Sequence, residues 1–139
     1  MKLYAIILVS GSGKTYNANL YHNVIELEQV CGFCSKCEKL TKAGKWDELA
    51  RLRAKHFNDE VFPKGLEKML VLLHSHQEAK AIGALVLGYY KVEYGDFIKI
   101  KRNDKTVWRE HHWHNAKTAE IKTHKEIASI IKRVVYKLL

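Results

Sequence analysis

The stretch LYAIILVSGSGKTYNANLY, from Leu3 to Tyr21, decides how this chain folds. An apolar run ends at Ser-Gly-Ser-Gly, and after Lys14 the segment from Thr15 to Tyr21 alternates between polar and apolar residues. Alternation with a period of two is typical of a β-strand that is buried on one face. We therefore predict a strand, a tight turn and a second strand, so that this stretch forms the first hairpin of a sheet.

The same turn allows a second interpretation, because a phosphate-binding loop has the pattern G-x-x-x-x-G-K-[ST] after a strand. Its backbone N–H groups wrap the phosphates and its lysine reaches their outer oxygens. Here only the first glycine is missing, since Leu8 stands in its place. The acidic residue expected after a second apolar strand is also missing, because that run ends in His74. We favour the hairpin; the alternative is an NTP-binding protein that uses Ser10, Gly11, Ser12, Gly13, Lys14 and Thr15.

Length and charge bound the possible functions. The 139 residues fit a single domain, residues 1–139, with one hydrophobic core. The 24 Lys and Arg residues exceed the 15 Asp and Glu residues, which gives a net charge of +9 and indicates a polyanionic partner, most commonly a nucleic acid. No apolar run approaches the roughly 18 residues that span a bilayer, so we expect no membrane association.

Three cysteines lie within seven residues, Cys31, Cys34 and Cys37. An odd number of cysteines argues against a disulfide framework and for a reducing compartment, so we predict a cytoplasmic protein. On one helix face the three thiolates could bind zinc if a fourth ligand folded over them. Packing of three small side chains is the preferred interpretation. We expect no cofactor, with zinc as the alternative.

Histidines form two H-x-H pairs, His74 with His76 and His112 with His114. On a strand, both members of such a pair face the same side, which is the geometry by which two imidazoles reach one metal ion. A metal-dependent nuclease or phosphoesterase is therefore a third hypothesis. Surface histidines on a solvated strand are the simpler interpretation.

The rest of the chain predicts a sheet flanked by helices. We expect helices from about Asn23 to the Ala43-Gly44 signal and from Trp46 to Phe57, and buried strands at Lys68 to His74 and Ala81 to Val92. Asp96 to Arg102 alternates strictly and predicts a hairpin with Thr106 to His114. A capping box at Thr123 and Glu126 predicts an amphipathic helix from Lys125 to Leu139 that packs on the sheet. The expected fold class is α+β, with a small mixed sheet or a partly closed barrel.

The predicted hairpin is rich in basic and aromatic residues. Basic side chains release counterions from phosphates and aromatic planes stack on unpaired bases, so this mixture favours RNA or single-stranded DNA. For any single lysine a solvated hairpin face is the better explanation, and only the clustering and the net charge of +9 favour nucleic acid. The predicted nucleic-acid contacts are Lys14, Lys99, Lys101, Arg102, Lys105, Trp108, Arg109 and Trp113.

The order of elements resembles the PUA-like superfamily, especially its ASCH and EVE branches. The resemblance is carried by a Gly-Lys turn between two strands, by the segments Met69 to Ser75 and Ala81 to Leu87, and by a C-terminal helix. It implies a small β-barrel whose cleft binds RNA or modified bases. The ASCH signature G-x-K-x-x-E-x-R falls on Ser12 to Asn19, where Lys14 agrees, so the resemblance implies that Lys14 is a cleft residue. Binding of RNA or single strands is thus the first functional expectation, and the oligomeric state stays open.

Overall fold

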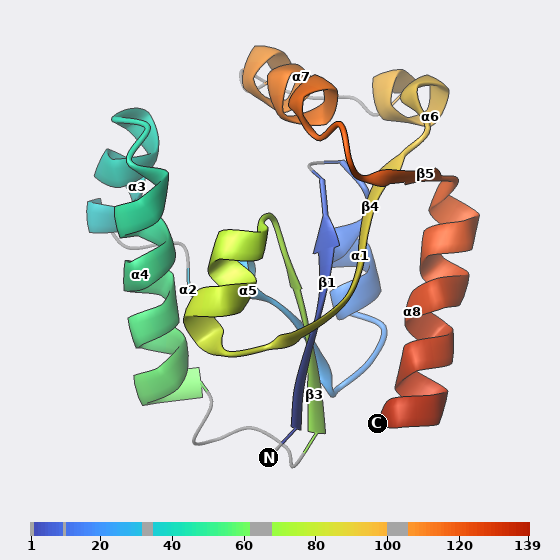
Figure 1. Cartoon of the computed structure of the whole chain (residues 1–139), viewed down its shortest axis with the longest axis horizontal. Helices are drawn as coiled ribbons and strands as arrows, with labels where there is room; N and C mark the ends of the chain where they lie inside the picture. Colours follow the sequence, from blue (N-terminus) through green and yellow to red (C-terminus); the bar gives the residue numbers. More distant parts are fainter. Residues whose placement is uncertain (1, 10, 32–34, 62–67, 100–105) are drawn as a thin grey trace.

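The computed structural model describes residues 2–9, 11–31, 35–61, 68–99 and 106–139. Its centre is a five-stranded sheet with the strand order β2-β3-β1-β4-β5, in which every pair of neighbours is parallel (Figure 1). The strands are β1 (Lys2–Leu8), β2 (Val24–Glu26), β3 (Lys68–Leu73), β4 (Leu85–Val92) and β5 (Glu120–Lys122).

Helices cover both faces of this sheet. The core beside α1 and α8 contains Ile6 and Leu8 of β1, whereas the core beside α4 and α5 contains Ala5 and Ile7. Successive strand residues point to opposite faces, so a strand covered on both sides reads as one continuous apolar run. The helical segments are α1 (Lys14–Ala18), α2 (Leu27–Cys31), α3 (Ser35–Lys42), α4 (Trp46–His56), the π-helical turn η1 (Phe57–Val61), α5 (His76–Ile82), α6 (Tyr94–Lys99), α7 (Thr106–Asn115) and α8 (His124–Leu138).

The predicted α+β class is confirmed, and the C-terminal helix packs on the sheet. The sheet was expected to be mixed, but the described strands are all parallel to their neighbours. The side chain of Thr123 accepts from the backbone N–H of Glu126, and the Glu126 side chain accepts from the backbone N–H of Thr123, so the predicted capping box is present. Ile127 and Ile131 of α8 are fully buried. In the described residues the sheet is open, with β2 and β5 at its edges, so no closed barrel is formed there. The described helices include none with the length and apolar character of a bilayer span.

The hairpin predicted for Leu3 to Tyr21 is wrong, because a helix follows the turn. Lys14–Ala18 is α1, and the Asn17 side chain donates to the carbonyl oxygen of Gly13, four positions before it, over 2.8 Å. Strand β1 pairs with β3 on one side and with β4 on the other, so no edge of β1 is left for a hairpin partner. The alternation from Thr15 to Tyr21 therefore does not mark a strand: on α1, side chains two positions apart point about 200° apart, and Ala18 is buried whereas Tyr16 is 67% exposed.

The hairpin predicted for Asp96 to His114 is also wrong. Its two arms are the helices α6 and α7, and the expected turn at Asn103 to Lys105 lies outside the described residues. Packing overrides the alternation: Phe97 is buried against the rings of Tyr94 and Trp113, whereas Ile98 is 61% exposed. Where side chains from the two arms meet, helical spacing decides which of them are buried.

Two further boundaries differ from those predicted. The helix expected from Asn23 contains the short strand β2, which pairs with β3 through Ile25 and Val71. The strand expected from Ala81 starts later, because α5 ends at Gly83, whose φ of 73° is a left-handed conformation that glycine adopts without strain. The strand predicted at Lys68 to His74 and the helix predicted at Trp46 to Phe57 agree with β3 and α4 to within one residue.

Candidate functional site

Several polar side chains lie at the carboxyl edge of the parallel sheet. After β1 the chain continues to β2 on one side of β1, whereas after β4 it continues to β5 on the other side. The direction in which strands are added to the sheet therefore reverses beside β1. Open parallel sheets bind ligands at the carboxyl ends of the strands where this reversal occurs. At this edge lie the loop Gly11 to Lys14, the acidic residues that follow β2, and His74 after β3.

Of the loop after β1 the structure describes Gly11 to Gly13, whereas Ser10 lies outside the described residues. Gly11 and Gly13 have φ angles of 84° and 87°, which side chains other than glycine rarely adopt. Ser12 is buried and its hydroxyl accepts from the backbone N–H of Val92 at the end of β4, over 3.1 Å. The ring of His124 lies 3.0 Å, through Nε2, from the carbonyl oxygen of Gly11. The loop is therefore tied to β4 and to the start of α8.

Lys14 is a buried cation beneath this loop. Its side-chain Nζ donates to the carbonyl oxygen of Leu8 over 3.3 Å. Burial lowers the pKa of Lys14, and the charges of Glu28 and Glu26 oppose this shift only in part. Removing a charge from water is unfavourable unless an opposite charge pairs with it. Lys14 is thus a buried basic group whose desolvation the nearby carboxylates do not fully offset.

Thr15 follows directly and contacts an acidic residue from a neighbouring element. Its hydroxyl donates to Glu26 with 2.5 Å between Oγ1 and Oε2. Glu26 is the last residue of β2 and is buried. The acidic residue beside the turn therefore comes from the end of β2 and not from the end of β3.

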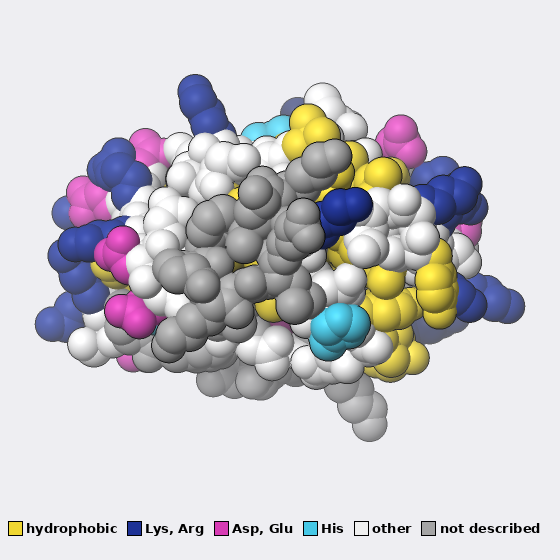
Figure 2. All heavy atoms as spheres, turned by 90° about the horizontal axis from the view of Figure 1, so that it is seen from below, with side chains coloured by type: hydrophobic (Ala, Val, Ile, Leu, Met, Phe, Trp, Pro, Cys, Tyr) yellow, Lys and Arg dark blue, Asp and Glu magenta, His cyan; other side chains and the backbone are white. Residues whose placement is uncertain are grey.

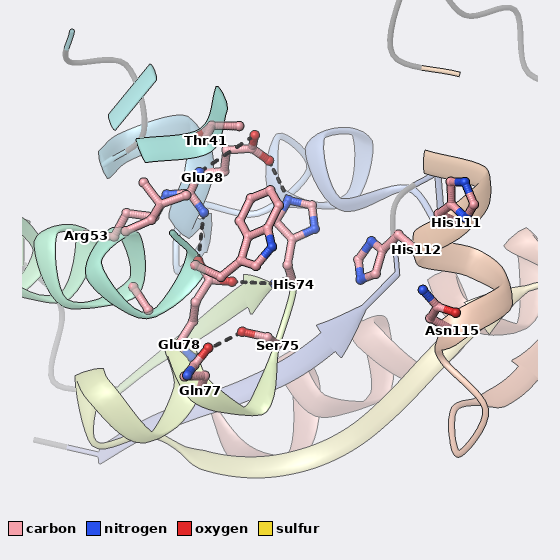
Figure 3. Close-up of a pocket in the computed structure, with 13 residues that line it drawn as sticks. Glu28, Thr41, Arg53, His74, Ser75, Gln77, Glu78, His111, His112 and Asn115 are labelled. Carbon is pink, nitrogen blue, oxygen red and sulfur yellow. Dashed lines mark hydrogen bonds and ion pairs between the residues drawn. The ribbon is translucent and has the colours of Figure 1, made fainter. Parts of the chain in front are cut away.

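A cavity of about 390 Å³ adjoins this edge between α4, the start of α5 and α7 (Figure 3). This volume lies within the roughly 300–1,000 Å³ of small-molecule sites. Trp46, Leu49 and Ala50 of α4 supply apolar surface. The polar groups that line it include Glu28, Arg53, His74, Glu78, His112 and Asn115.

A network of charged groups forms one wall of the cavity. The ring of His74 contacts Glu28 with 2.5 Å between Nε2 and Oε2, and its backbone N–H donates to Glu78 over 3.0 Å. Arg53 donates to Glu78 over 2.9 Å and lies 3.9 Å from Glu28. The hydrogen bond from His74 is the main cause that lowers the pKa of Glu28 to about 2. Glu28 is therefore ionised at neutral pH.

His112 reaches the opposite wall from α7 (Figure 3). Its ring centroid lies 5.7 Å from that of His74. Burial, followed by the charges of His74 and Lys14, lowers the pKa of His112 to about 4. The structure thus brings together one member of each H-x-H pair, although their spacing in sequence pointed to two separate pairs.

The metal-binding patterns are not assembled in the described residues. His112 and His114 lie on α7, where side chains two positions apart point about 200° apart, so the face predicted for a strand does not exist. Cys37 is buried in α3 beside Leu40 and Leu49. Cys31 ends α2 without a described side chain, and Cys34 lies outside the described residues. No cluster of three metal-ligating side chains occurs in the described ranges.

The predicted nucleic-acid contacts do not form one surface among the described residues. Trp113 is buried, and its indole N–H donates to the carbonyl of Val92 over 2.8 Å. Lys99 is exposed at the end of α6, and Arg109 lies close enough to Lys14 to lower its pKa. Lys101, Arg102 and Lys105 lie outside the described residues, as does the side chain of Trp108. On the face drawn in Figure 2, Lys and Arg side chains gather at two opposite ends of the molecule.

Sequence reasoning missed four residues of this site: Glu26, Glu28, Arg53 and Glu78. For Glu26 and Glu28 the available signal was VIELE, in which two apolar residues precede two glutamates that flank Leu27, as at the end of a buried strand that reaches a polar edge. Assigning Val24 to a helix concealed it. No protein-family model matches this chain, and no curated protein matches it either.

Proposed function

We propose that this chain binds a nucleoside triphosphate on the loop from Gly11 to Thr15 and transfers its terminal phosphoryl group to a second substrate. The observation that carries the proposal is the position of Lys14, which is buried at the carboxyl end of the central strand with its Nζ 3.3 Å from the carbonyl of Leu8. Phosphoryl transfer depends mainly on positioning and on stabilising negative charge, and a desolvated lysine contributes to both.

The surroundings of the loop support a phosphate site. A strand precedes the loop and helix α1 follows it, as the phosphate-binding motif requires. The single departure from the motif, Leu8, is the last residue of β1 and is fully buried. Gly11 and Gly13 supply the left-handed conformations of the turn instead.

Nucleoside triphosphates bind together with Mg²⁺, which prefers oxygen ligands. In a phosphate-binding loop the Ser or Thr after the lysine offers its hydroxyl to this ion, and Thr15 occupies that position. Glu26 holds the Thr15 hydroxyl over 2.5 Å and so fixes its direction. These oxygen groups fit the chemistry of Mg²⁺, which when bound neutralises charge on the phosphates.

The adjoining cavity favours transfer over simple nucleotide binding. It lies within electrostatic range of Lys14, since Lys14 perturbs the pKa values of the cavity residues Glu28 and His112. A second substrate held there would stand beside the phosphates. Holding both reactants in one site removes much of the entropic barrier to their reaction.

Replacing the lysine tests the proposal. Lys14→Ala should weaken the binding of ATP or GTP about 10- to 100-fold in a fluorescence or calorimetric titration, because it removes a hydrogen bond to a charged group. Lys55→Ala is the matched control, since Lys55 is exposed on α4. Equal nucleotide affinity in both variants would contradict the proposal.

Nucleic-acid binding is the second candidate, favoured by the net charge of +9. Charge alone supports it, because the predicted hairpin is absent and Trp113 is buried. The test is a salt titration: the affinity for a single-stranded oligonucleotide should fall linearly on a logarithmic scale as salt rises. Affinity that does not change with salt would remove this candidate.

A further inference from the structure

Two buried polar atoms beside the cavity have no hydrogen-bond partner within the described residues, Nε of Arg53 and Nδ1 of His74. Both residues line the cavity. A buried donor or acceptor without a partner is unfavourable, and two of them at one cavity indicate that a ligand supplies the missing partners. Nε of Arg53 can donate a hydrogen bond, and Nδ1 of His74 can accept one when it carries no proton. A ligand hydroxyl can accept from the first and donate to the second.

The charges on this wall are already balanced. The guanidinium of Arg53 lies 2.9 Å from Glu78 and 3.9 Å from Glu28, so two carboxylates compensate it. Burial lowers the pKa of His112 to about 4, which keeps that ring neutral at pH 7. A phosphorylated ligand would therefore meet no uncompensated cation among the described residues that line the cavity. An uncharged ligand fits this wall better, because it needs no counter-charge.

The contact between His74 and Glu28 indicates which nitrogen of the imidazole donates a hydrogen bond. Glu28 is ionised and can only accept, so Nε2 of His74 donates to it. In the neutral tautomer that donates through Nε2, the other ring nitrogen, Nδ1, carries a lone pair and can take up a proton. A histidine oriented by a carboxylate in this way is a common arrangement of general bases.

We propose that the cavity binds an uncharged compound that carries a hydroxyl group, and that Nδ1 of His74 accepts the hydroxyl proton as the oxygen attacks the terminal phosphorus of the nucleoside triphosphate. This inference rests on the proposed function. The new bond joins the hydroxyl oxygen to phosphorus, and the bond from phosphorus to the bridging oxygen breaks with its electron pair left on the nucleoside diphosphate. The products are a phosphate monoester, the diphosphate and protonated His74.

The groups around the pair of His74 and Glu28 are consistent with this role. Protonation of His74 strengthens its contact with the Glu28 carboxylate, while Lys14 opposes a second positive charge nearby. These neighbours come from different helices: Glu28 of α2, Arg53 of α4, Glu78 of α5, His112 of α7 and Lys14 of α1.

The test uses ATP labelled at its terminal phosphate and matched sets of acceptors. One set holds the uncharged compounds adenosine, cytidine, thymidine, glucose and glycerol; the other holds their monophosphates. We expect label transfer to a member of the uncharged set and none to the monophosphates. Transfer only to monophosphates, or nucleotide binding that depends on Lys14 without transfer to any uncharged compound, would overturn the inference and leave nucleotide binding intact. Loss of Lys14-dependent nucleotide binding would instead overturn the proposed function.

Variants of the base complete the test. His74→Gln should lower the transfer rate about 10²- to 10⁴-fold with the nucleotide affinity unchanged, since it removes the proton acceptor. The transfer rate of the wild type should fall as the pH is lowered, and His74→Gln should not show this fall. His56→Gln is the matched control because His56 is exposed on α4. If His74→Gln unfolds, Glu28→Gln provides the second measurement: it keeps the shape of the side chain and should shift the pH profile of transfer. Unchanged rates and pH profiles in the folded variants would overturn the role of His74.

Discussion

The hydroxyl of Thr15 donates a hydrogen bond to the carboxylate of Glu26, with 2.5 Å between Oγ1 and Oε2. The two residues lie eleven positions apart, one directly after the loop of β1 and the other at the end of β2. Because β2 is an edge strand that pairs only with β3 among the described strands, this bond also ties the edge of the sheet to the loop. The first prediction follows from it.

Thr15→Val removes the hydroxyl and keeps the shape of the side chain. We expect the affinity for ATP in the presence of Mg²⁺ to fall about 10-fold, toward the value measured with EDTA, because one oxygen ligand is lost. The measurement is a nucleotide titration with and without Mg²⁺. Thr118→Val is the control, since Thr118 is exposed before β5. A Thr15→Val variant with the full Mg²⁺ dependence of the wild type would contradict the assigned role.

Trp113→Ala should act on stability, although the sequence suggested a stacking surface. The indole is buried, Nζ of Lys91 lies 3.9 Å from its ring centroid, and Tyr94 packs against it. Truncating such a side chain costs about 3–5 kcal/mol. Chemical denaturation should show this loss, whereas Trp113→Phe should recover much of it. An undiminished unfolding free energy in Trp113→Ala would show that the ring is not part of the core.

The parts of the fold that follow from local signals were predictable. The run from Lys68 and the capping box at Thr123 define β3 and the start of α8, because a continuous apolar run and a side-chain cap need no knowledge of distant residues. The segment after Lys14 was not predictable in this way. Its alternation is typical of a strand, but β3 and β4 occupy both edges of β1 and leave no place there for a second strand, so only the whole sheet excludes the hairpin.

The candidate site was likewise predictable only in part. Lys14 was identified from its motif, whereas Glu26 and Glu28 were hidden in a segment taken for a helix. The meeting of His74 with Glu28 joins residues 46 positions apart, and no spacing rule connects them. Once a parallel sheet is known, the carboxyl ends of β2 and β3 must lie side by side, and the pairing follows.

Acid should destabilise the protein in two pH ranges. The pKa of His112 is lowered to about 4, so between about pH 6.5 and 4 the unfolded chain takes up a proton that the folded chain does not, and stability falls. The pKa of Glu28 is lowered to about 2, so its contribution is complete above its usual pKa of 4.5 and is lost as the pH falls toward 2. Each loss has an upper limit of about 3 kcal/mol, and solvent screening reduces that of Glu28, whose side chain is 40% exposed.

Denaturant titrations from pH 8 to 3 measure this dependence. His112→Gln should abolish the loss of stability between about pH 6.5 and 4. It should retain the loss at lower pH, because only the histidine is replaced. His56→Gln, at an exposed position of α4, should retain both ranges. A wild-type unfolding free energy that stays constant from pH 7 to 4 would be incompatible with a buried, neutral His112.

Lys14→Met should stabilise the protein in the absence of nucleotide. Burial lowers the pKa of Lys14 despite three nearby carboxylates, so the folded protein holds this ammonium group less favourably than water does. An apolar side chain of similar length avoids that desolvation, and we expect the unfolding free energy to rise by about 1 kcal/mol. Lys55→Met, on the exposed face of α4, should change it by less than about 0.5 kcal/mol. At one ATP concentration the wild type should be stabilised more than Lys14→Met, because stabilisation by a ligand grows with its affinity for the folded form. A destabilised Lys14→Met would mean that the lysine serves the fold, whereas a stabilised variant that responds less to ATP would assign its unfavourable burial to phosphate binding.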